Sequence, residues 1–134
     1  MAATGMRRYW GIAETIGELC PGAQWSITDN DYTKLQWFST DQQPPTLEAI
    51  QAKQAELEAA EPMRVVREIR DWYLQQSDWT QGADIRNIRG SDWCASWDKY
   101  RQDLRNLPDS GITPSFDQMN FIQGVTWPEM PNTK

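Results

Sequence analysis

Hydrophobic positions recur with a helical period in two stretches, residues 63–76 and 91–108. In the second stretch they follow one another at steps of 4, 3, 4 and 3, which places them on one face of a helix. These positions are Trp93, Trp97, Tyr100, Leu104 and Leu107. The first stretch carries a row of Val65, Ile69 and Trp72, widened by Val66, Tyr73 and Leu74. Two stripes this rich in aromatic residues predict an antiparallel helical hairpin that holds most of the buried area.

Local signals mark the ends of these two helices. Pro62 suits the first position of one helix, where its missing N–H costs nothing, and Ser91 suits the N-cap of the other. Residues 77–82 are expected to form a structured turn. In this turn Asp78 would accept from amide groups two residues on, and Trp79 would pack back against both helices.

The N-terminal part shows a different pattern. After a loose segment over residues 1–10, residues 12–20 predict a short helix that ends at Pro21-Gly22. Residues 24–28 alternate polar and apolar side chains as a strand does, and residues 29–31 have the composition of a turn. Residues 32–38 then predict a second strand, so this part should contain a β-hairpin.

Pro44-Pro45 separates the N-terminal part from the helices, because two prolines favour extended backbone. Thr46 is a plausible N-cap for a helix through Ala60 whose apolar stripe is thin. That helix is expected to be peripheral, with an oligomerising seam as the alternative. Residues 109–134 lack a helical period but carry many apolar side chains, so this extended tail either wraps the domain or docks on another molecule.

These patterns predict an α+β fold that is mostly α. We expect three parts: a small N-terminal lobe of helix and β-hairpin over residues 1–43, a helical region over residues 44–108, and an extended C-terminal tail over residues 109–134. The helical region should contain the tryptophan-rich antiparallel hairpin.

Composition narrows the function classes. The chain has 134 residues, eight tryptophans and a formal net charge of −6. Tryptophan in that amount exceeds what a small core needs, so a surplus is available for an interface. The acidic balance argues against nucleic-acid binding, and no apolar run approaches the roughly 18 residues of a membrane span. Without a secretion signal, Cys20 and Cys94 are expected to be reduced thiols.

The sequence offers few candidate residues for catalysis or for binding a cofactor or metal. The chain has no histidine, and it shows no phosphate-binding loop, calcium-binding loop or zinc-ligand spacing. We therefore predict no catalytic, cofactor-binding or metal-ligating residues and no enzyme activity. Several arginines lie beside acids on the two main helices, and ion pairs that fix the helix register are favoured there over anion binding. The arginines are Arg67, Arg70, Arg101 and Arg105, and the acids are Asp71, Asp98 and Asp103.

Three motifs follow one another along the chain. The first, R-x-x-R-D-x-x-L-x-x-x-D-W-T-Q, comprises Arg67, Arg70, Asp71, Leu74, Asp78, Trp79, Thr80 and Gln81. The second, W-x-x-Y-R-Q-x-L-R-x-L-P, comprises Trp97, Tyr100, Arg101, Gln102, Leu104, Arg105, Leu107 and Pro108. The last is Trp127-Pro128 with Pro131. In this order they resemble the phage tail assembly chaperones and tail-fibre assembly proteins, small accessory proteins of tailed bacteriophages.

The resemblance implies assembly without catalysis. Such a protein would bind a tail-fibre or other tail or baseplate polypeptide in the host cytoplasm, aid its folding, trimerisation or attachment, and bind neither nucleic acid nor membrane. It could also be retained in the virion tail. Candidate partner-binding residues are Trp79, Phe116, Phe121, Trp127 and Pro128. Two alternatives remain open, a structural component of the baseplate or fibre attachment site and a small acidic inhibitor of a host protein; the oligomeric state stays open.

Overall fold

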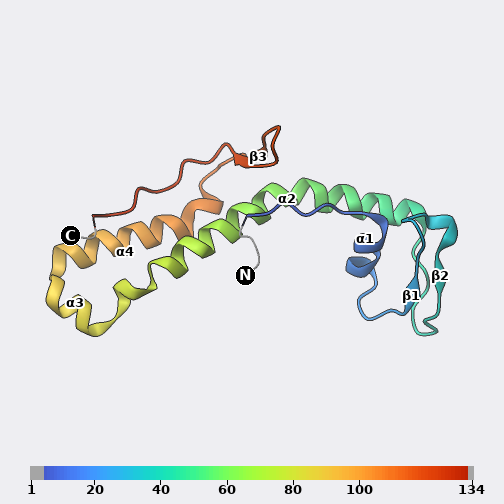
Figure 1. Cartoon of the computed structure of the whole chain (residues 1–134), viewed down its shortest axis with the longest axis horizontal. Coiled ribbons are helices and arrows are strands. Elements are labelled where there is room, and N and C mark those ends of the chain that lie inside the picture. Colours follow the sequence, from blue (N-terminus) through green and yellow to red (C-terminus); the bar gives the residue numbers. More distant parts are fainter. Residues whose placement is uncertain (1–4, 133–134) are drawn as a thin grey trace. The chain divides into compact units, whose positions relative to one another are not determined.

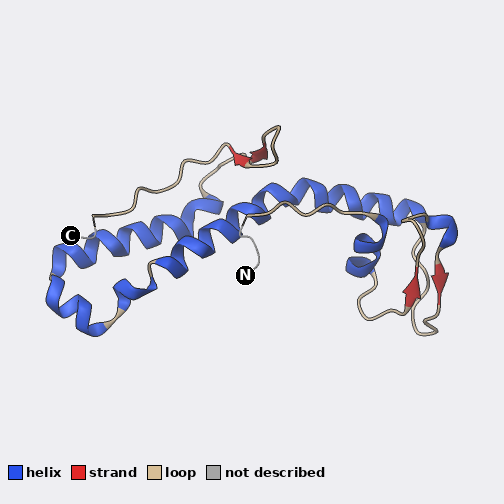
Figure 2. Ribbon diagram, viewed as in Figure 1, coloured by secondary structure: helices blue, strands red, loops and turns tan. Residues whose placement is uncertain are grey.

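The computed structural model describes residues 5–132, which form two compact units. One unit consists of residues 8–61, and the other consists of residues 62–132 together with residues 5–7. Helices dominate the described part of the chain, and two short antiparallel strand pairs accompany them (Figure 2). The predicted α+β, mostly α class is therefore confirmed.

The unit of residues 8–61 begins with helix α1 (Ile12–Leu19), close to its predicted position. Thr15 and Ile16 are fully buried on its inner face. The chain leaves the helix through Gly22, whose φ of +79° is a backbone conformation that glycine adopts without strain. The side chain of Asn30 accepts a hydrogen bond from the amide of Ala13 at 3.1 Å. Asn30 thus satisfies a first-turn amide that Gly11, lacking a side chain, leaves open.

The predicted β-hairpin is present but much shorter than expected. Strand β1 (Trp25–Ser26) pairs antiparallel with β2 (Gln36–Trp37), and Trp25 lies opposite Trp37. The prediction of a strand over residues 32–38 was wrong at its start, because Tyr32–Lys34 form a 3-10 turn, η1. The carboxylate of Asp31 accepts from the amide of Thr33 and stabilises that turn.

Helix α2 (Leu47–Gln76) is a single helix where the sequence predicted two. Thr46 caps it as expected, because its hydroxyl accepts from the amide of Ala49 at 3.1 Å. Pro62 lies inside the helix and does not begin a new one, so its predicted place at a helix start was wrong. A proline in a helix interior removes one hydrogen bond, but strong helix formers surround it here. Burial of Ile50 before it and of Val65 and Val66 after it stabilises both halves.

An extended segment lies along α2 where the sequence predicted a loose chain. In the unit of residues 8–61, the amides of Arg8 and Trp10 donate to the carboxylates of Glu61 and Glu58. In the other unit, the amide of Gly5 donates to Glu68 at 3.0 Å. Side chains of the helix thus take up backbone groups of residues 5–10, so the expectation of a loose segment was wrong for these described residues.

In the unit of residues 62–132, helix α2 is followed by the 3-10 turn η2 (Asp78–Gln81), α3 (Ala83–Arg89), α4 (Ser91–Asn106) and the 3-10 turn η3 (Leu107–Asp109). Helix α3 was not predicted. Gly90, with φ of +86°, is the N-cap of α4, and Ser91 is its first residue, so the predicted serine cap was wrong by one position. The end of α2 and α4 lie side by side and run in opposite directions (Figure 1).

The core of this unit confirms the predicted helical hairpin. Trp97, Tyr100 and Leu104 of α4 are buried and in contact. Tyr73 and Leu74 of α2 pack against them, together with Trp93 and Trp127. The period of hydrophobic residues in α4 therefore identified the buried face correctly, including Leu107 at its end.

The C-terminal tail wraps the helical hairpin. It contains a second strand pair, in which β3 (Ser115–Phe116) pairs antiparallel with β4 (Ile122–Gln123). Farther along, the ring of Trp127 packs on that of Tyr73 with 5.3 Å between centroids. The tail was predicted either to wrap the domain or to dock on another molecule. The packing of Trp127 at the edge of the core agrees with the first alternative.

Candidate partner-binding surface

Arg101 of α4 links the two main helices. Its side chain is only about 9% exposed, and its guanidinium donates to the carbonyl of Leu74 at 2.8 Å and to the hydroxyl of Ser77 at 2.6 Å. The last carbonyls of an α-helix lack partners within the helix, so a cation placed there satisfies one of them and interacts favourably with the helix dipole. For Arg101, the prediction that motif arginines fix the register of the hairpin agrees with these contacts.

Asp78 has a different role from the predicted one. Its carboxylate forms an ion pair with Arg101 at 3.0 Å, and the contacts seen for it in the structure do not include the expected capping bond. The turn η2 is held instead by Ser77, whose carbonyl accepts from the amide and the hydroxyl of the buried Thr80. Arg101 and Asp78 together therefore place the turn beside α4.

Trp79 in this turn packs against α4, one of the two helices predicted to contact it, and also reaches solvent. Its ring lies 5.8 Å from that of Trp93 and 5.6 Å from that of Trp97, centroid to centroid, and Trp97 in turn meets Tyr100 edge-on at 5.6 Å. Trp79 is nevertheless 47% exposed. The row of aromatic rings thus runs from the buried core to an exposed indole, which is suited to contact another molecule.

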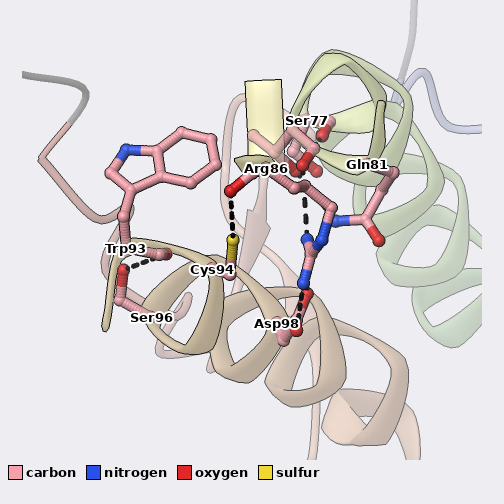
Figure 3. Close-up of polar contacts among 8 residues, drawn as sticks. Ser77, Gln81, Arg86, Trp93, Cys94, Ser96 and Asp98 are labelled. Atoms are coloured by element: carbon pink, nitrogen blue, oxygen red, sulfur yellow. Dashed lines mark hydrogen bonds and ion pairs between the residues drawn. The ribbon is translucent and has the colours of Figure 1, made fainter. Parts of the chain in front are cut away.

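Arg86 of α3 holds the turn and the short helix against α4 (Figure 3). Its guanidinium forms two hydrogen bonds with Asp98, at 3.1 and 2.8 Å, and donates to the carbonyl of Thr80. The hydrogen bond from Arg86 lowers the pKa of Asp98 and raises the pKa of Arg86 itself. The thiol of Cys94 contacts the carbonyl of Arg86 at 3.6 Å, and Cys20 and Cys94 are both free.

Sequence reasoning missed the role of Arg86, because it lies outside the recognised motifs. Asp98 was expected to pair with an arginine of the main helices, yet it pairs with α3. The i, i+12 spacing of Arg86 and Asp98 carries no periodic signal that would have revealed the pair.

An open groove of about 490 Å³ lies along the end of α2 and the start of η2. Trp72 and Leu74 supply its apolar surface, and Trp72 is partly exposed. The other lining residues are polar or acidic: Glu68, Asp71, Gln75 and Asp78. The carboxylates have internal partners, since Glu68 pairs with Arg64 and Asp71 with Arg70. The groove therefore offers an apolar strip with acceptor groups along it, a surface suited to an extended polypeptide.

The remaining motif residues are dispersed. Arg70 pairs with its neighbour Asp71 at 2.8 Å, whereas Arg67 and Arg105 lie exposed on α2 and α4. Asp103 pairs with Lys99 at 2.6 Å within α4. Of the predicted partners, Arg70 and Asp71 therefore pair with each other, whereas Asp98 and Asp103 pair with Arg86 and Lys99. Arg101 pairs with Asp78 of η2 and reaches α2 through its hydrogen bond to the carbonyl of Leu74.

The predicted partner-binding residues fall into two groups. Trp127, Pro128 and Phe116 are partly buried against the fold, and Arg7 places its guanidinium 4.6 Å from the ring centre of Phe116. Phe121 and Trp79 are exposed. The structure does not bring these five residues together in one patch around the groove, whose lining includes none of them.

Within residues 5–132, no three or more His, Cys, Asp or Glu side chains come together in a group that could hold a metal ion. Within the same range, every helix is too short or too polar to cross a lipid bilayer.

Comparison with known proteins identifies the family. The model of the family described as phage tail assembly chaperone protein matches residues 63–132, which is more than half of the chain. The match covers the end of α2, η2, α3, α4 and the tail, and so includes the groove, the aromatic row and Arg101. The search of curated proteins and that of solved structures gave no match. This chain belongs to the phage tail assembly chaperone protein family, and its role is in tail assembly.

Proposed function

We propose that this protein binds a tail-fibre or other tail or baseplate polypeptide in the host cytoplasm and keeps it soluble while it folds, trimerises or attaches. The protein acts by transient binding and without catalysis. The observation that carries the proposal is the groove beside Trp72, which lies within the segment matched by the family.

The geometry of the groove supports a polypeptide as the occupant. Trp72 and Leu74 can cover apolar side chains of a partly folded chain, and Gln75 and the carboxylates can accept from its unpaired backbone amides. Trp79, at the end of the aromatic row, offers a further partly exposed indole. Aromatic anchors of this kind contribute much of the binding energy in protein interfaces.

The charge of the chain suits the same role. A net charge of −6 keeps the protein soluble while its aromatic surface is unoccupied. Because the groove carboxylates are paired internally, they add hydrogen-bond acceptors without a large unbalanced charge. Binding is therefore expected to depend only weakly on salt.

Co-expression with the tail-fibre gene of the same phage tests the proposal. The protein should raise the yield of soluble fibre trimer, measured by gel filtration. Gln75→Arg places a long cationic side chain in the groove and should abolish that gain. Gln51→Arg makes the same change at an exposed position of the same helix outside the groove and should preserve it. A yield unaffected by the unmodified protein would refute the proposed function.

Release after assembly is part of the proposal. Mass spectrometry of purified virions should therefore detect little or none of this protein. Stoichiometric presence in the particle would instead identify it as a structural component of the baseplate or fibre attachment site.

A further inference from the structure

The turn between β3 and β4 is held rigidly by hydrogen bonds. The carboxylate of Asp117 accepts from the amides of Met119 and Phe121, at 2.8 and 3.0 Å. The amide of Asp117 donates to the carbonyl of Phe121 at 2.8 Å, and Asn120 takes a left-handed conformation with φ of +65°. Asparagine tolerates that conformation better than most residues, so sequence and geometry agree on one turn shape.

This rigid turn holds two large apolar side chains in solvent. Met119 is 75% exposed and Phe121 is 64% exposed, whereas Phe116 and Ile122 in the strands are partly buried. A turn formed only to connect two strands needs no such side chains at its tip. Because the backbone is already fixed, binding through Met119 and Phe121 would lose little conformational entropy.

Arg7 fastens the strand pair to the body of the unit. Its guanidinium lies over the ring of Phe116, and it donates to the side chain of Asn120 at 3.0 Å. Nearby, Gly5 is bonded to Glu68 of α2. Arg7 thus anchors the turn through Phe116 and Asn120, while the side chains of Met119 and Phe121 stay exposed.

The charge of this segment and the small apolar area of Met119 and Phe121 indicate what kind of molecule binds them. Residues 109–132 contain three acids, Asp109, Asp117 and Glu129, and no lysine or arginine, so this segment stays acidic even with Arg7 packed against the turn. A second copy of this acidic chain would be repelled, and two side chains offer far less than the roughly 800 Å² per partner that a stable interface buries. An apolar pocket bordered by basic side chains on a different polypeptide fits better.

We propose that Met119 and Phe121 form a second contact point, separate from the groove, which inserts into an apolar pocket with a basic rim on the tail polypeptide. This inference rests on the proposed function, since the occupant is the same polypeptide. The groove holds an extended segment of the partner, and the turn fixes the position of that partner by an anchor of defined shape.

Photo-crosslinking in infected cells tests where the partner lies. Benzoylphenylalanine is introduced in the full-length protein at position 121, at position 75 in the groove, and at the exposed position 88 of α3 as a control. Mass spectrometry should identify the same phage tail polypeptide crosslinked at positions 121 and 75 but not at 88. Crosslinking at 75 alone, or at 121 to a second copy, would overturn this inference and leave the proposed function standing. Absence of a tail polypeptide at all three positions would overturn both.

Affinity measurements with the crosslinked polypeptide, purified, test the role of the turn. Met119→Ser with Phe121→Ser should weaken binding at least tenfold. Ile88→Ser with Met130→Ser, which removes two other exposed apolar side chains elsewhere, should change it less than twofold. Asp117→Ala should weaken binding several-fold by loosening the turn, and Asp117→Asn, which keeps an acceptor oxygen, should restore it. Equal affinity of the two double variants would overturn the inference.

Discussion

Arg101 is the residue whose contacts matter most for the helical hairpin. Replacing it with alanine leaves the carbonyl of Leu74, the hydroxyl of Ser77 and the carboxylate of Asp78 without their shared donor. We expect Arg101→Ala to lower the free energy of unfolding by about 2–4 kcal/mol. The exposed Arg105→Ala should change it by less than about 0.5 kcal/mol. Urea denaturation of both variants gives the comparison, and equal effects would contradict the role assigned to Arg101.

The ion pair of Asp98 with Arg86 leads to a prediction about how the stability of the protein depends on pH. The hydrogen bond from Arg86 lowers the pKa of Asp98 in the folded protein. A carboxyl group with a lowered pKa adds stability above its unfolded pKa of about 3.9, and this contribution is lost as the pH falls through the lowered value. Asp98→Asn should therefore reduce the fall in melting temperature between pH 5 and pH 2. The change should be small, because half of the Asp98 side chain is exposed.

Thermal melts of the unmodified protein and of Asp98→Asn across that range provide the measurement. Asp103→Asn, which alters a more local pair with Lys99, serves as the comparison. An identical pH dependence in the unmodified protein and in Asp98→Asn would contradict the assignment.

Among single residues, the sequence predicted the buried positions that recur at helical spacing. It did not predict the ion pairs between residues that lie far apart in the chain. Trp97, Tyr100 and Leu104 recur at helical spacing, and their burial followed directly from the pattern. The pairs of Arg86 with Asp98 and of Arg101 with Asp78 join residues brought together only by the turn. The geometry of these pairs depends on the path of the chain through the turn, which the hydrophobic pattern does not determine.

Among the elements, Pro62 in α2 is the most unexpected. It lacks the N–H that would donate to the carbonyl of Glu58, and proline is about 3 kcal/mol less favourable than alanine inside a helix. We expect Pro62→Ala to raise the free energy of unfolding by roughly 1–3 kcal/mol and to increase helical circular dichroism. A destabilised variant would show instead that the proline ring makes a required packing contact.

Helix α3 was not predicted from the sequence because it is short and flanked by glycines. It has seven residues between two glycines, Gly82 and Gly90, and such a short segment has little helical stability alone. Its contacts with α4 through Arg86 hold it in place. The groove was equally beyond prediction, because its walls depend on how the turn η2 lies against α2. The sequence did predict the short strand pair near the N-terminus, but not the 3-10 turn that shortens it.

At the scale of the whole molecule, the C-terminal tail contributes to the stability of the fold as well as to the proposed contact with a partner. Trp127 packs on Tyr73 at the edge of the core, so Trp127→Ala should lower the free energy of unfolding by about 1–3 kcal/mol. Met130→Ala, which changes an exposed residue of the same tail, should have little effect. Denaturation curves for the two variants test this. A Trp127→Ala protein as stable as the unmodified one would show that this ring serves a partner and not the core.

The bond between Arg7 and Asn120 joins positions 113 residues apart in the chain. During translation, Arg7 is synthesised before α2 and α4, and its acceptor Asn120 is synthesised after both. This hydrogen bond can therefore form only after both helices have been made. A nascent chain interrupted before residue 120 would lack the bond from Arg7 to Asn120, and the side chains of Met119 and Phe121 would reach their fixed geometry only after synthesis had passed residue 121.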